Sequence, residues 1–285
     1  MTIQEASRYS ADKLTTIYEP TEAAAITDWL IEHLTGTRKT DRITLSKKEL
    51  PADQQDQLET YLKRLLTYEP IQYVLNEAWF CGLRLYVDNR VLIPRPETEE
   101  LVEWIITHCK FPISELNILD IGTGSGCIPI ALKRRLGKAD VWSCDVSTDA
   151  LTVAARNAED LGVIVNLVNL NFLSEAEREK LPQFDIIVSN PPYIPHKDKA
   201  EMHTNVLAYE PATALFVPDN DPLLFYKAIA DFGKSHLNPN GIIYTELHKD
   251  ISALAKEMFE SRGYMVELKK DMQGVERMLK ATISQ

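Results

Sequence analysis

The sequence has few of the features that mark disulfide-linked, zinc-binding or membrane-spanning chains. Its four cysteines form no CxxC pair, and its six histidines show neither HxxxH nor HExxH spacing. We therefore expect reduced cysteines and no dedicated metal site. No stretch approaches the roughly 20 apolar residues of a membrane helix, and residues 1–13 hold no apolar signal core. These absences predict a cytoplasmic protein with no membrane partner.

Positive charge is also scarce. The chain has 31 basic and 42 acidic residues, which gives a formal net charge of −11. Binding to a phosphate backbone needs clustered Lys and Arg that displace counterions, so this balance argues against direct binding of nucleic acid. Apolar residues make up 45% and charged residues 26% of the 285 positions, as in ordinary globular proteins. The length fits one large domain or two unequal ones.

Residues 1–70 predict a small bundle of two to five helices. Apolar residues recur at steps of three and four over 25–34, where we expect Thr21 to cap the helix and Gly36 to end it. The same spacing returns after Pro51, and no alternating strand pattern appears in this region. We expect an N-terminal helical domain.

Residues 71–95 predict a β-hairpin that connects two domains. Short extended runs are expected at 73–75, 79–80 and 83–87, with Asp88-Asn89 as a turn between extended runs. Pro96 suits the first turn of the helix that follows.

From residue 96 the chain alternates strands and helices. Strands are expected at 117–121, 139–146, 164–168, 184–190, 241–247, 264–270 and 278–284. Helices are expected at 125–136, 148–161, 222–236 and 250–262. Repeated strand–helix units predict an α/β fold with a mostly parallel sheet and helices on both faces. The last two strands lie too close in sequence for a crossover helix, so we expect them to pair antiparallel.

Unusual residues stand at the carboxyl ends of four of these strands. The first ends in Asp120-Ile-Gly-Thr-Gly-Ser-Gly126, the second at Asp145, the third near Asn171-Phe172 and the fourth in Asn190-Pro-Pro-Tyr193. Ligands of a doubly wound sheet bind at the carboxyl ends of its strands. The four segments therefore predict one shared site.

The glycine loop and the acid after the second strand indicate a cofactor that contains adenosine. Gly122, Gly124 and Gly126 lack Cβ atoms, so the backbone can approach a ligand closely. Asp145 stands where a carboxylate can accept the hydroxyls of a ribose. The alternatives are a tight strand-to-helix turn for the loop and a helix cap for Asp145.

The Asn190-Pro191-Pro192-Tyr193 segment predicts a stiff turn that binds a planar NH₂ group. Its two prolines fix φ and remove two backbone donors. The side-chain oxygen of Asn190 and the carbonyl of Pro191 can accept the two N–H bonds of such a group. Tyr193 offers a flat face for stacking on an amide or a base. The alternative is a rigid loop with an exposed aromatic residue.

These motifs resemble those of class I S-adenosylmethionine methyltransferases that modify a planar nitrogen. Together with Leu92-Ile-Pro-Arg-Pro-Glu-Thr-Glu99 and Tyr209-Glu-Pro-Ala-Thr-Ala-Leu215, they closely resemble the HemK/PrmC protein-(glutamine-N5) methyltransferases, which act on peptide chain release factors. The resemblance implies a Rossmann-like seven-stranded sheet with an antiparallel last strand over residues 96–285. We expect the helical domain at residues 1–70 to dock the substrate protein; the alternative is a role in stability alone.

The resemblance also implies roles for individual residues. The cofactor would lie against Gly122, Thr123, Gly124, Ser125, Gly126, Asp145, Phe172 and Asn190, with the ribose on Asp145 and the adenine near Phe172. The substrate glutamine would lie against Asn190, Pro191, Pro192 and Tyr193, of which Asn190, Pro191 and Tyr193 would be catalytic. No metal is implied. His196 is expected to be a solvated loop residue rather than a base.

The implied reaction moves a methyl group from S-adenosylmethionine to the N5 nitrogen of the glutamine in the Gly-Gly-Gln motif of release factors, and leaves S-adenosylhomocysteine. We expect a monomer. Three alternatives stay open: a ribosomal-protein glutamine methyltransferase, an adenine-N6 nucleic-acid methyltransferase and a catalytically silent cofactor-binding module. The roles of Glu97, Glu210 and Glu246 also stay open, because the first two can serve as helix or turn residues.

Overall fold

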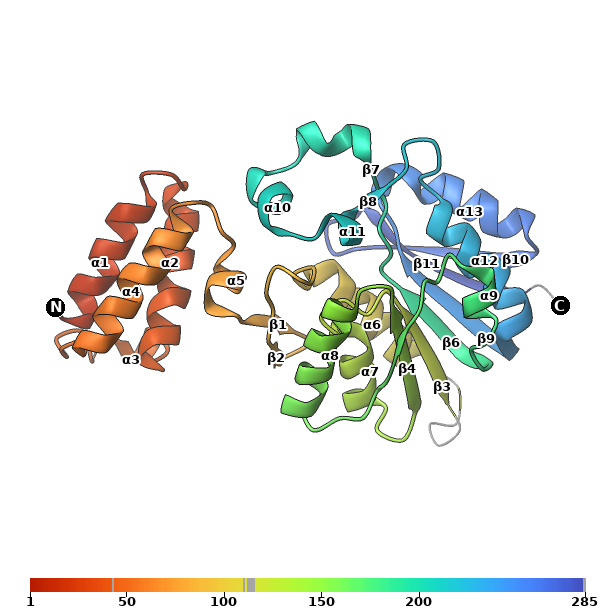
Figure 1. The fold of residues 1–285 in the computed structure, drawn as a ribbon, viewed down its shortest axis with the longest axis horizontal. Helices are drawn as coiled ribbons and strands as arrows, with labels where there is room; N and C mark the ends of the chain where they lie inside the picture. Colours follow the sequence, from red (N-terminus) through yellow and green to blue (C-terminus); the bar gives the residue numbers. More distant parts are fainter. Residues whose placement is uncertain (43, 110, 112–115, 284–285) are drawn as a thin grey trace. The chain divides into compact units, whose positions relative to one another are not determined.

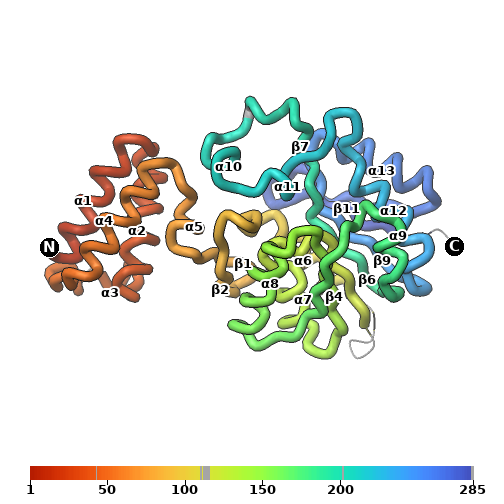
Figure 2. The backbone as a smooth tube through the Cα atoms, viewed as in Figure 1, coloured from red at the N-terminus to blue at the C-terminus, as the bar shows by residue number. Residues whose placement is uncertain are grey.

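The chain forms two compact units. The computed structural model describes residues 1–42, 44–109, 111 and 116–283 (Figures 1 and 2). One unit comprises Met1–Glu77 with His203–Tyr209, and the other comprises Ala78–Met202 with Glu210–Gln285. No helix in the described part of the chain is both long and apolar enough to cross a bilayer.

The first unit is helical, as predicted. Its helices are α1 (Ile3–Leu14), α2 (Pro20–Thr35), α3 (Lys39–Arg42), α4 (Ala52–Leu65), α5 (Ile71–Leu75) and α10 (Thr204–Tyr209). Fully buried leucine and isoleucine side chains from α1, α2 and α4 form its core, including Leu14, Leu30, Ile31 and Leu58. The apolar spacing seen in the sequence therefore corresponds to the buried faces of these helices.

The start of α2 differs from the prediction. The predicted cap, Thr21, lies inside the first turn, and Glu19 is the N-cap residue without a side-chain hydrogen bond. Pro20 explains the difference, because its fixed φ suits the first helical position and its missing N–H costs nothing there. The predicted end is confirmed: Gly36 has a φ of 65° and closes the helix.

The predicted strand at 73–75 is also wrong, because α5 covers it. Its side chains Tyr73, Val74 and Leu75 are buried in or beside the helical core, and this burial outweighs their preference for strands. The hairpin itself is confirmed as β1 (Ala78–Phe80) and β2 (Leu83–Leu85).

The hairpin turn lies at a different position from the predicted Asp88-Asn89. It is formed by Cys81 and Gly82, whose φ angles of 49° and 73° are both positive, as a two-residue type I′ turn requires. Asp88 instead makes a separate turn, in which its carboxylate accepts hydrogen bonds from the backbone and side chain of Arg90.

The second unit contains the predicted seven-stranded sheet. Its strands are β3 (Asn117–Ile121), β4 (Asp140–Asp145), β5 (Asn166–Asn169), β6 (Phe184–Ser189), β9 (Leu237–Glu246), β10 (Tyr264–Lys270) and β11 (Glu276–Ile283). The strand order is β10-β11-β9-β6-β3-β4-β5. Within this sheet β11 runs opposite to the other strands, which are parallel to one another, so the α/β prediction with an antiparallel last strand is confirmed. Position 284 of the predicted last strand lies outside the described residues.

Helices cover both faces of this sheet. The longer ones are α6 (Pro96–His108), α7 (Cys127–Arg135), α8 (Thr148–Asp160), α12 (Leu224–His236) and α13 (Ser252–Ser261). Neighbouring β3 residues face opposite layers: Ile118 belongs to one hydrophobic cluster with Trp104 of α6, and Leu119 belongs to another with Phe232 of α12 and Phe259 of α13. The sheet is thus buried on both faces. A ligand can therefore reach it at the carboxyl ends of the strands.

Shorter elements complete the unit. They are α9 (Glu175–Arg178), β7 (Ile194–Pro195), the 3₁₀ helix His196–Glu201, α11 (Ala212–Leu215), β8 (Phe216–Val217) and the 3₁₀ helix Lys249–Ile251. The short strands β7 and β8 pair in parallel and tie together the two ends of residues 194–217.

Strand register brings the predicted site residues to one edge. Ile121 at the end of β3 pairs with Cys144 of β4 on one side and with Ser189 of β6 on the other. Asp145 pairs with Asn169 of β5. Because these strands are parallel, the segments that follow them start at the same level.

Candidate active site

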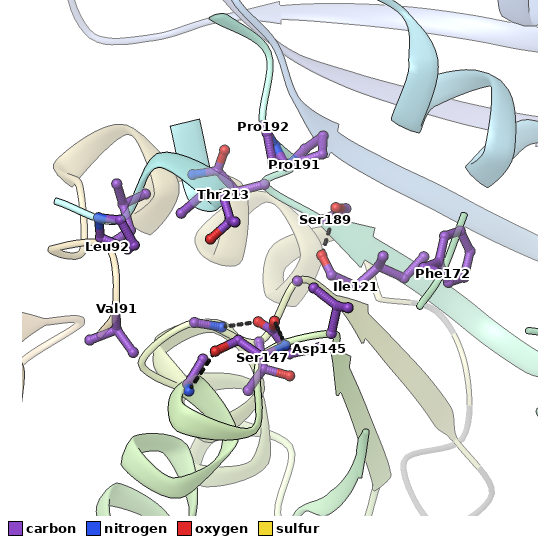
Figure 3. A pocket seen from close by; sticks show the side chains of 18 of the residues that line it. Val91, Leu92, Ile121, Asp145, Ser147, Phe172, Ser189, Pro191, Pro192 and Thr213 are labelled. Atoms are coloured by element: carbon purple, nitrogen blue, oxygen red, sulfur yellow. Dashed lines mark hydrogen bonds between the residues drawn. The ribbon is translucent and has the colours of Figure 1, made fainter. Parts of the chain in front are cut away.

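A cavity of about 380 Å³ opens at this edge of the sheet. Its wall combines the ends of β3, β4, β5 and β6 with residues 90–98 and with residues from 211–225 (Figure 3). The volume lies in the range usual for small-molecule sites. Three of the four predicted segments contribute most of their residues to this wall, and the fourth contributes its first three.

The glycine loop is held tightly beneath the cavity. The backbone N–H groups of Gly122 and Thr123 donate to the carbonyl of Cys144 at 2.9 and 3.1 Å. Gly122, Gly124 and Gly126 have φ angles of 87°, 52° and 81°, which side chains rarely tolerate. Residues 122–125 line the cavity. A tight turn is therefore present, and it also faces the cavity.

Gly126 has a different position from the rest of the loop. A Cβ atom there would lie 3.0 Å from Ile130 and 3.1 Å from Ala154 of α8. Its glycine is required for close packing of the loop against the helices. Its predicted contact with cofactor remains a prediction.

Asp145 lines the cavity and organises the backbone around it. Its Oδ2 accepts from the Gly124 N–H at 3.0 Å, and its Oδ1 accepts from the Ser147 N–H at 2.9 Å (Figure 3). The helix-cap alternative is wrong, because Ser147 caps α8 by accepting from the Ala150 N–H. Each oxygen of the half-buried Asp145 carboxylate keeps a lone pair for another donor.

Asp120 lies below the loop and is fully buried. Its Oδ2 accepts from the Ser143 hydroxyl at 2.6 Å, and Ser143 in turn hydrogen-bonds to the Thr123 hydroxyl at 2.7 Å. Its Oδ1 has no hydrogen-bond partner among the described residues. Burial raises the pKa of Asp120 to about 7, and the nearby charge of Asp145 adds to the rise. These contacts fix Thr123 in the cavity floor.

Phe172 lines the cavity after β5. Its ring packs edge-to-face with Phe232 at a centroid distance of 5.3 Å, and its carbonyl accepts from the Arg178 guanidinium at 3.2 Å. The side chain of the neighbouring Asn171 is hydrogen-bonded within its own loop, because its oxygen accepts from the Leu173 N–H at 3.1 Å. Phe172 thus offers a fixed aromatic surface on the side of the cavity where adenine was predicted.

The turn after β6 lies directly across from the glycine loop. Ser189, the last residue of β6, donates its hydroxyl to the carbonyl of Ile121 at 2.7 Å. The carbonyl oxygen of Asn190 would be 4.0 Å from a Cβ atom on Gly122. Asn190, Pro191 and Pro192 line the cavity, and Figure 3 labels the two prolines. The predicted cofactor and substrate segments therefore meet in one space.

Tyr193 is placed differently from the three residues before it. In the described chain, Tyr193 is not part of the cavity wall. Its ring lies 5.6 Å from that of His248, and burial raises the pKa of its hydroxyl. The alternative of an exposed aromatic residue does not hold for this half-buried ring. Its contact with substrate stays a prediction.

Three contacts beside the cavity could not be found from motifs alone. The Asn190 side-chain Nδ2 donates to the Thr98 hydroxyl at 3.0 Å, and Thr98 donates to Glu246 Oε2 at 2.6 Å. The Arg95 guanidinium donates to Glu210 Oε1 at 2.6 Å. The sequence shows that these residues belong to unusual segments or lie at strand ends. It does not show which of their side chains contact one another.

The predicted loop histidine and acids also have defined positions. His196 is exposed and stacks on Phe216 at 5.3 Å, in agreement with a loop residue. Glu97 and Glu99 lie in the first turn of α6, where negative charge suits the helix dipole. Glu210 is buried and also accepts from the Ile93 N–H at 3.2 Å. It therefore joins the loop at 210–211 to the segment before α6.

Comparison with known proteins identifies the family. Residues 5–75 match the PrmC N-terminal domain, and residues 99–216 match the Methyltransferase small domain. The chain is 42% identical to a release factor glutamine methyltransferase of Flavobacterium psychrophilum, over 94% of both chains. It is 40% identical to one of Bacteroides thetaiotaomicron, over 96% of this chain and 97% of that one.

The fold has solved counterparts. The crystal structure of a methyltransferase from Pyrococcus furiosus aligns with a TM-score of 0.53 and 19% identity, over 82% of this chain and 100% of that one. This likeness concerns the fold alone. Taken together with the sequence relatives, it shows that this chain has the class I methyltransferase fold and belongs to the release factor glutamine methyltransferase family.

Proposed function

We propose that the protein transfers a methyl group from S-adenosylmethionine to the side-chain N5 nitrogen of the glutamine in the Gly-Gly-Gln motif of peptide chain release factors. Membership of the family supports this reaction. The observation that carries it is that the Asn190-Pro191 turn and the Asp145 carboxylate line the same cavity. We further propose that the protein acts as a monomer in the cytoplasm, where release factors work.

The residues at the carboxyl edge fit S-adenosylmethionine. Asp145 has lone pairs free for two ribose hydroxyls, and Phe172 offers a flat apolar surface for the adenine. The position that a Cβ atom of Gly124 would take has no protein atom within 4 Å. We propose that the amino-acid part of the cofactor occupies this open space. When bound, S-adenosylmethionine supplies an electrophilic methyl group on a positively charged sulfur.

The turn after β6 fits the nitrogen that accepts the methyl group. A primary carboxamide has two N–H donors in one plane, and the Asn190 Oδ1 and the Pro191 carbonyl can each accept one of them. Pro191 and Pro192 have no N–H groups, so this turn offers few competing donors. We infer that the two acceptors orient the amide nitrogen toward the methyl group, and such positioning can contribute several kcal/mol.

The same acceptors favour the transition state. An amide nitrogen is a weak nucleophile because its lone pair is delocalised into the carbonyl. As the nitrogen attacks, it gains positive character, and its N–H bonds to Asn190 and Pro191 become stronger. The methylated nitrogen carries one extra proton, and we infer that this proton passes to water after methyl transfer, because the lining of the cavity holds no described histidine to take it earlier.

Other acceptors with a planar NH₂ group are less well supported. A ribosomal-protein glutamine would fit the same two acceptors, but the sequence relatives are named for release factors. Adenine would also offer an NH₂ group, but the net charge of −11 is unsuited to a phosphate backbone. We propose that the helical unit, which matches the PrmC N-terminal domain, docks the release factor.

A labelling experiment tests the substrate directly. The purified protein is incubated with methyl-labelled S-adenosylmethionine and, in parallel, with a release factor, ribosomal proteins and DNA. We expect label on the release factor, located by mass spectrometry on the glutamine of Gly-Gly-Gln and lost when that glutamine is replaced by glutamate. Label on ribosomal protein or DNA but not on the release factor would refute the proposed substrate.

A further inference from the structure

Three side chains from distant parts of the sequence form a hydrogen-bonded chain at the cavity. Asn190, in the cavity wall, donates from Nδ2 to the Thr98 hydroxyl at 3.0 Å. Thr98 donates to Glu246 Oε2 at 2.6 Å. Thr98 and Glu246 are each only 2% exposed, so water has little access to replace either contact.

The direction of this chain follows from counting protons. A threonine hydroxyl has one proton, and a carboxylate oxygen without a proton can only accept. When Glu246 is ionised, Thr98 therefore donates its only proton to Glu246 Oε2 and can only accept from Asn190. The carboxamide of Asn190 is thereby held with its NH₂ end toward Thr98, and the polar end that remains for a ligand is Oδ1.

We propose that Thr98 and Glu246 are positioning residues that keep the oxygen of the Asn190 carboxamide, rather than its NH₂ group, available to the substrate nitrogen. The inference rests on the proposed function only in that the substrate offers a planar NH₂ group. A carboxamide has nearly the same shape in both orientations, so packing alone selects weakly between them. Hydrogen bonding to a group with fixed polarity makes the selection.

If the Asn190 carboxamide were turned around, it would no longer offer an acceptor to the substrate, and its NH₂ group would face the NH₂ group of the substrate. The substrate nitrogen would then lose one of its two hydrogen bonds and meet a donor instead. This loss falls on turnover, because the acceptor is needed most as the nitrogen becomes positive. Cofactor binding at Asp145 and the glycine loop would be affected much less, since neither contacts Thr98 through a described hydrogen bond.

The kinetic test is a double-mutant cycle between Thr98 and Asn190. We expect Thr98→Val, which keeps the shape but removes the hydroxyl, to lower kcat by about 10- to 30-fold, with Kd for S-adenosylmethionine within about twofold of wild type. Thr98→Ser should restore kcat to within about threefold. In the Asn190→Ala background, Thr98→Val should cost less than about twofold, because its effect acts through Asn190.

Two results would overturn the positioning role. One is an equal loss from Thr98→Val with and without Asn190, which would mean a structural effect independent of the carboxamide. The other is full activity of Thr98→Val. The cycle is measured on whichever acceptor the wild type methylates, so a failure of the release-factor assignment leaves this test intact.

A spectroscopic test is independent of turnover. The side-chain NH₂ signal of Asn190 is identified in ¹⁵N–¹H spectra as the one lost in Asn190→Ala. We expect Thr98→Val to shift this signal and to increase its exchange with water, and Thr98→Ser to leave it near its wild-type position. A signal unchanged by Thr98→Val would refute the contact on which the inference depends.

Discussion

Replacing Glu246 with glutamine should change how the stability of the methyltransferase unit depends on pH. Burial raises the pKa of Glu246 from 4.5 to about 7. The charged groups that act on it are Glu97, which raises the pKa further, and Arg277 and Arg95, which lower it, together with the hydrogen bond from Thr98. The buried hydroxyls of Tyr193 and Tyr226 are also close enough to feel its charge.

The sign of the effect follows from the raised pKa. The folded protein holds the proton more tightly than the unfolded chain does, so this stabilisation is fully present below about pH 4.5 and is lost as the pH rises through about 7. The difference between these two values corresponds to about 3 kcal/mol. About 2 kcal/mol of it falls between roughly pH 5.5 and 8.5, a range that avoids the region near the pI.

Glu246→Gln removes the ionisation and keeps the size of the side chain. We expect its free energy of unfolding, relative to that of wild type, to increase by about 2 kcal/mol as the pH rises from roughly 5.5 to 8.5, which means that the variant becomes the more stable protein. Urea unfolding, followed by circular dichroism and tryptophan fluorescence, measures the difference at each pH. The buried Asp120, whose pKa is also raised, is present in both proteins and cancels.

A surface carboxylate provides the control. Glu257→Gln removes one negative charge from the exposed side of α13 and leaves the buried carboxyl group of Glu246 unchanged. The reasoning about Glu246 is refuted if the difference between wild type and Glu246→Gln stays constant across this pH range. That result would mean that Glu246 is already ionised in the folded protein at the lower end.

The other expected outcomes concern the cavity wall. Asn190→Ala should lower kcat by about 100-fold and leave Kd for S-adenosylmethionine, measured by calorimetry, within about threefold; an equal loss in both would contradict its role as an acceptor. Asp145→Ala should weaken cofactor binding by about 10- to 100-fold through two lost charge-assisted hydrogen bonds, and unchanged binding would remove it from the ribose site. Gly126→Ala should destabilise the fold by about 1–3 kcal/mol in urea unfolding, because its φ is 81° and its Cβ would meet Ile130 at 3.0 Å. Gly162→Ala, with a φ of 63° and open space around it, is the control that separates crowding from backbone strain.

Much of the fold was predictable because its elements are set by local patterns. Apolar runs between turn residues marked each strand of the large sheet, and the short link between its last two strands required antiparallel pairing. The predictions were wrong where another effect outweighs the local pattern. Because Pro20 takes the first helical position, α2 begins before the predicted cap. Burial of Tyr73 to Leu75 stabilises a helix formed by residues that favour strands. Cys81 was not expected at φ 49°, so the hairpin turn was missed.

The site was predictable only in part, because local chemistry and tertiary contacts carry different information. The glycine loop, Asp145 and the Asn190-Pro191-Pro192 turn reveal themselves through residue type and position after a strand. The contact of Thr98 with Glu246 spans 148 positions, and no pattern in the sequence says that these two side chains meet. Tyr193 shows the converse, since it belongs to a motif but packs beside His248 outside the cavity wall.

The stability cost and the proposed positioning role of Glu246 belong together. A neutral side chain in this buried position would avoid the cost of about 3 kcal/mol at high pH, so stability alone does not account for an acid there. A glutamine could hydrogen-bond to Thr98 either as donor or as acceptor, whereas a carboxylate oxygen can only accept and so imposes one direction on Thr98 and Asn190. We therefore expect Glu246→Gln to be more stable above neutral pH and slower in turnover, a combination that follows from directed hydrogen bonding and not from packing.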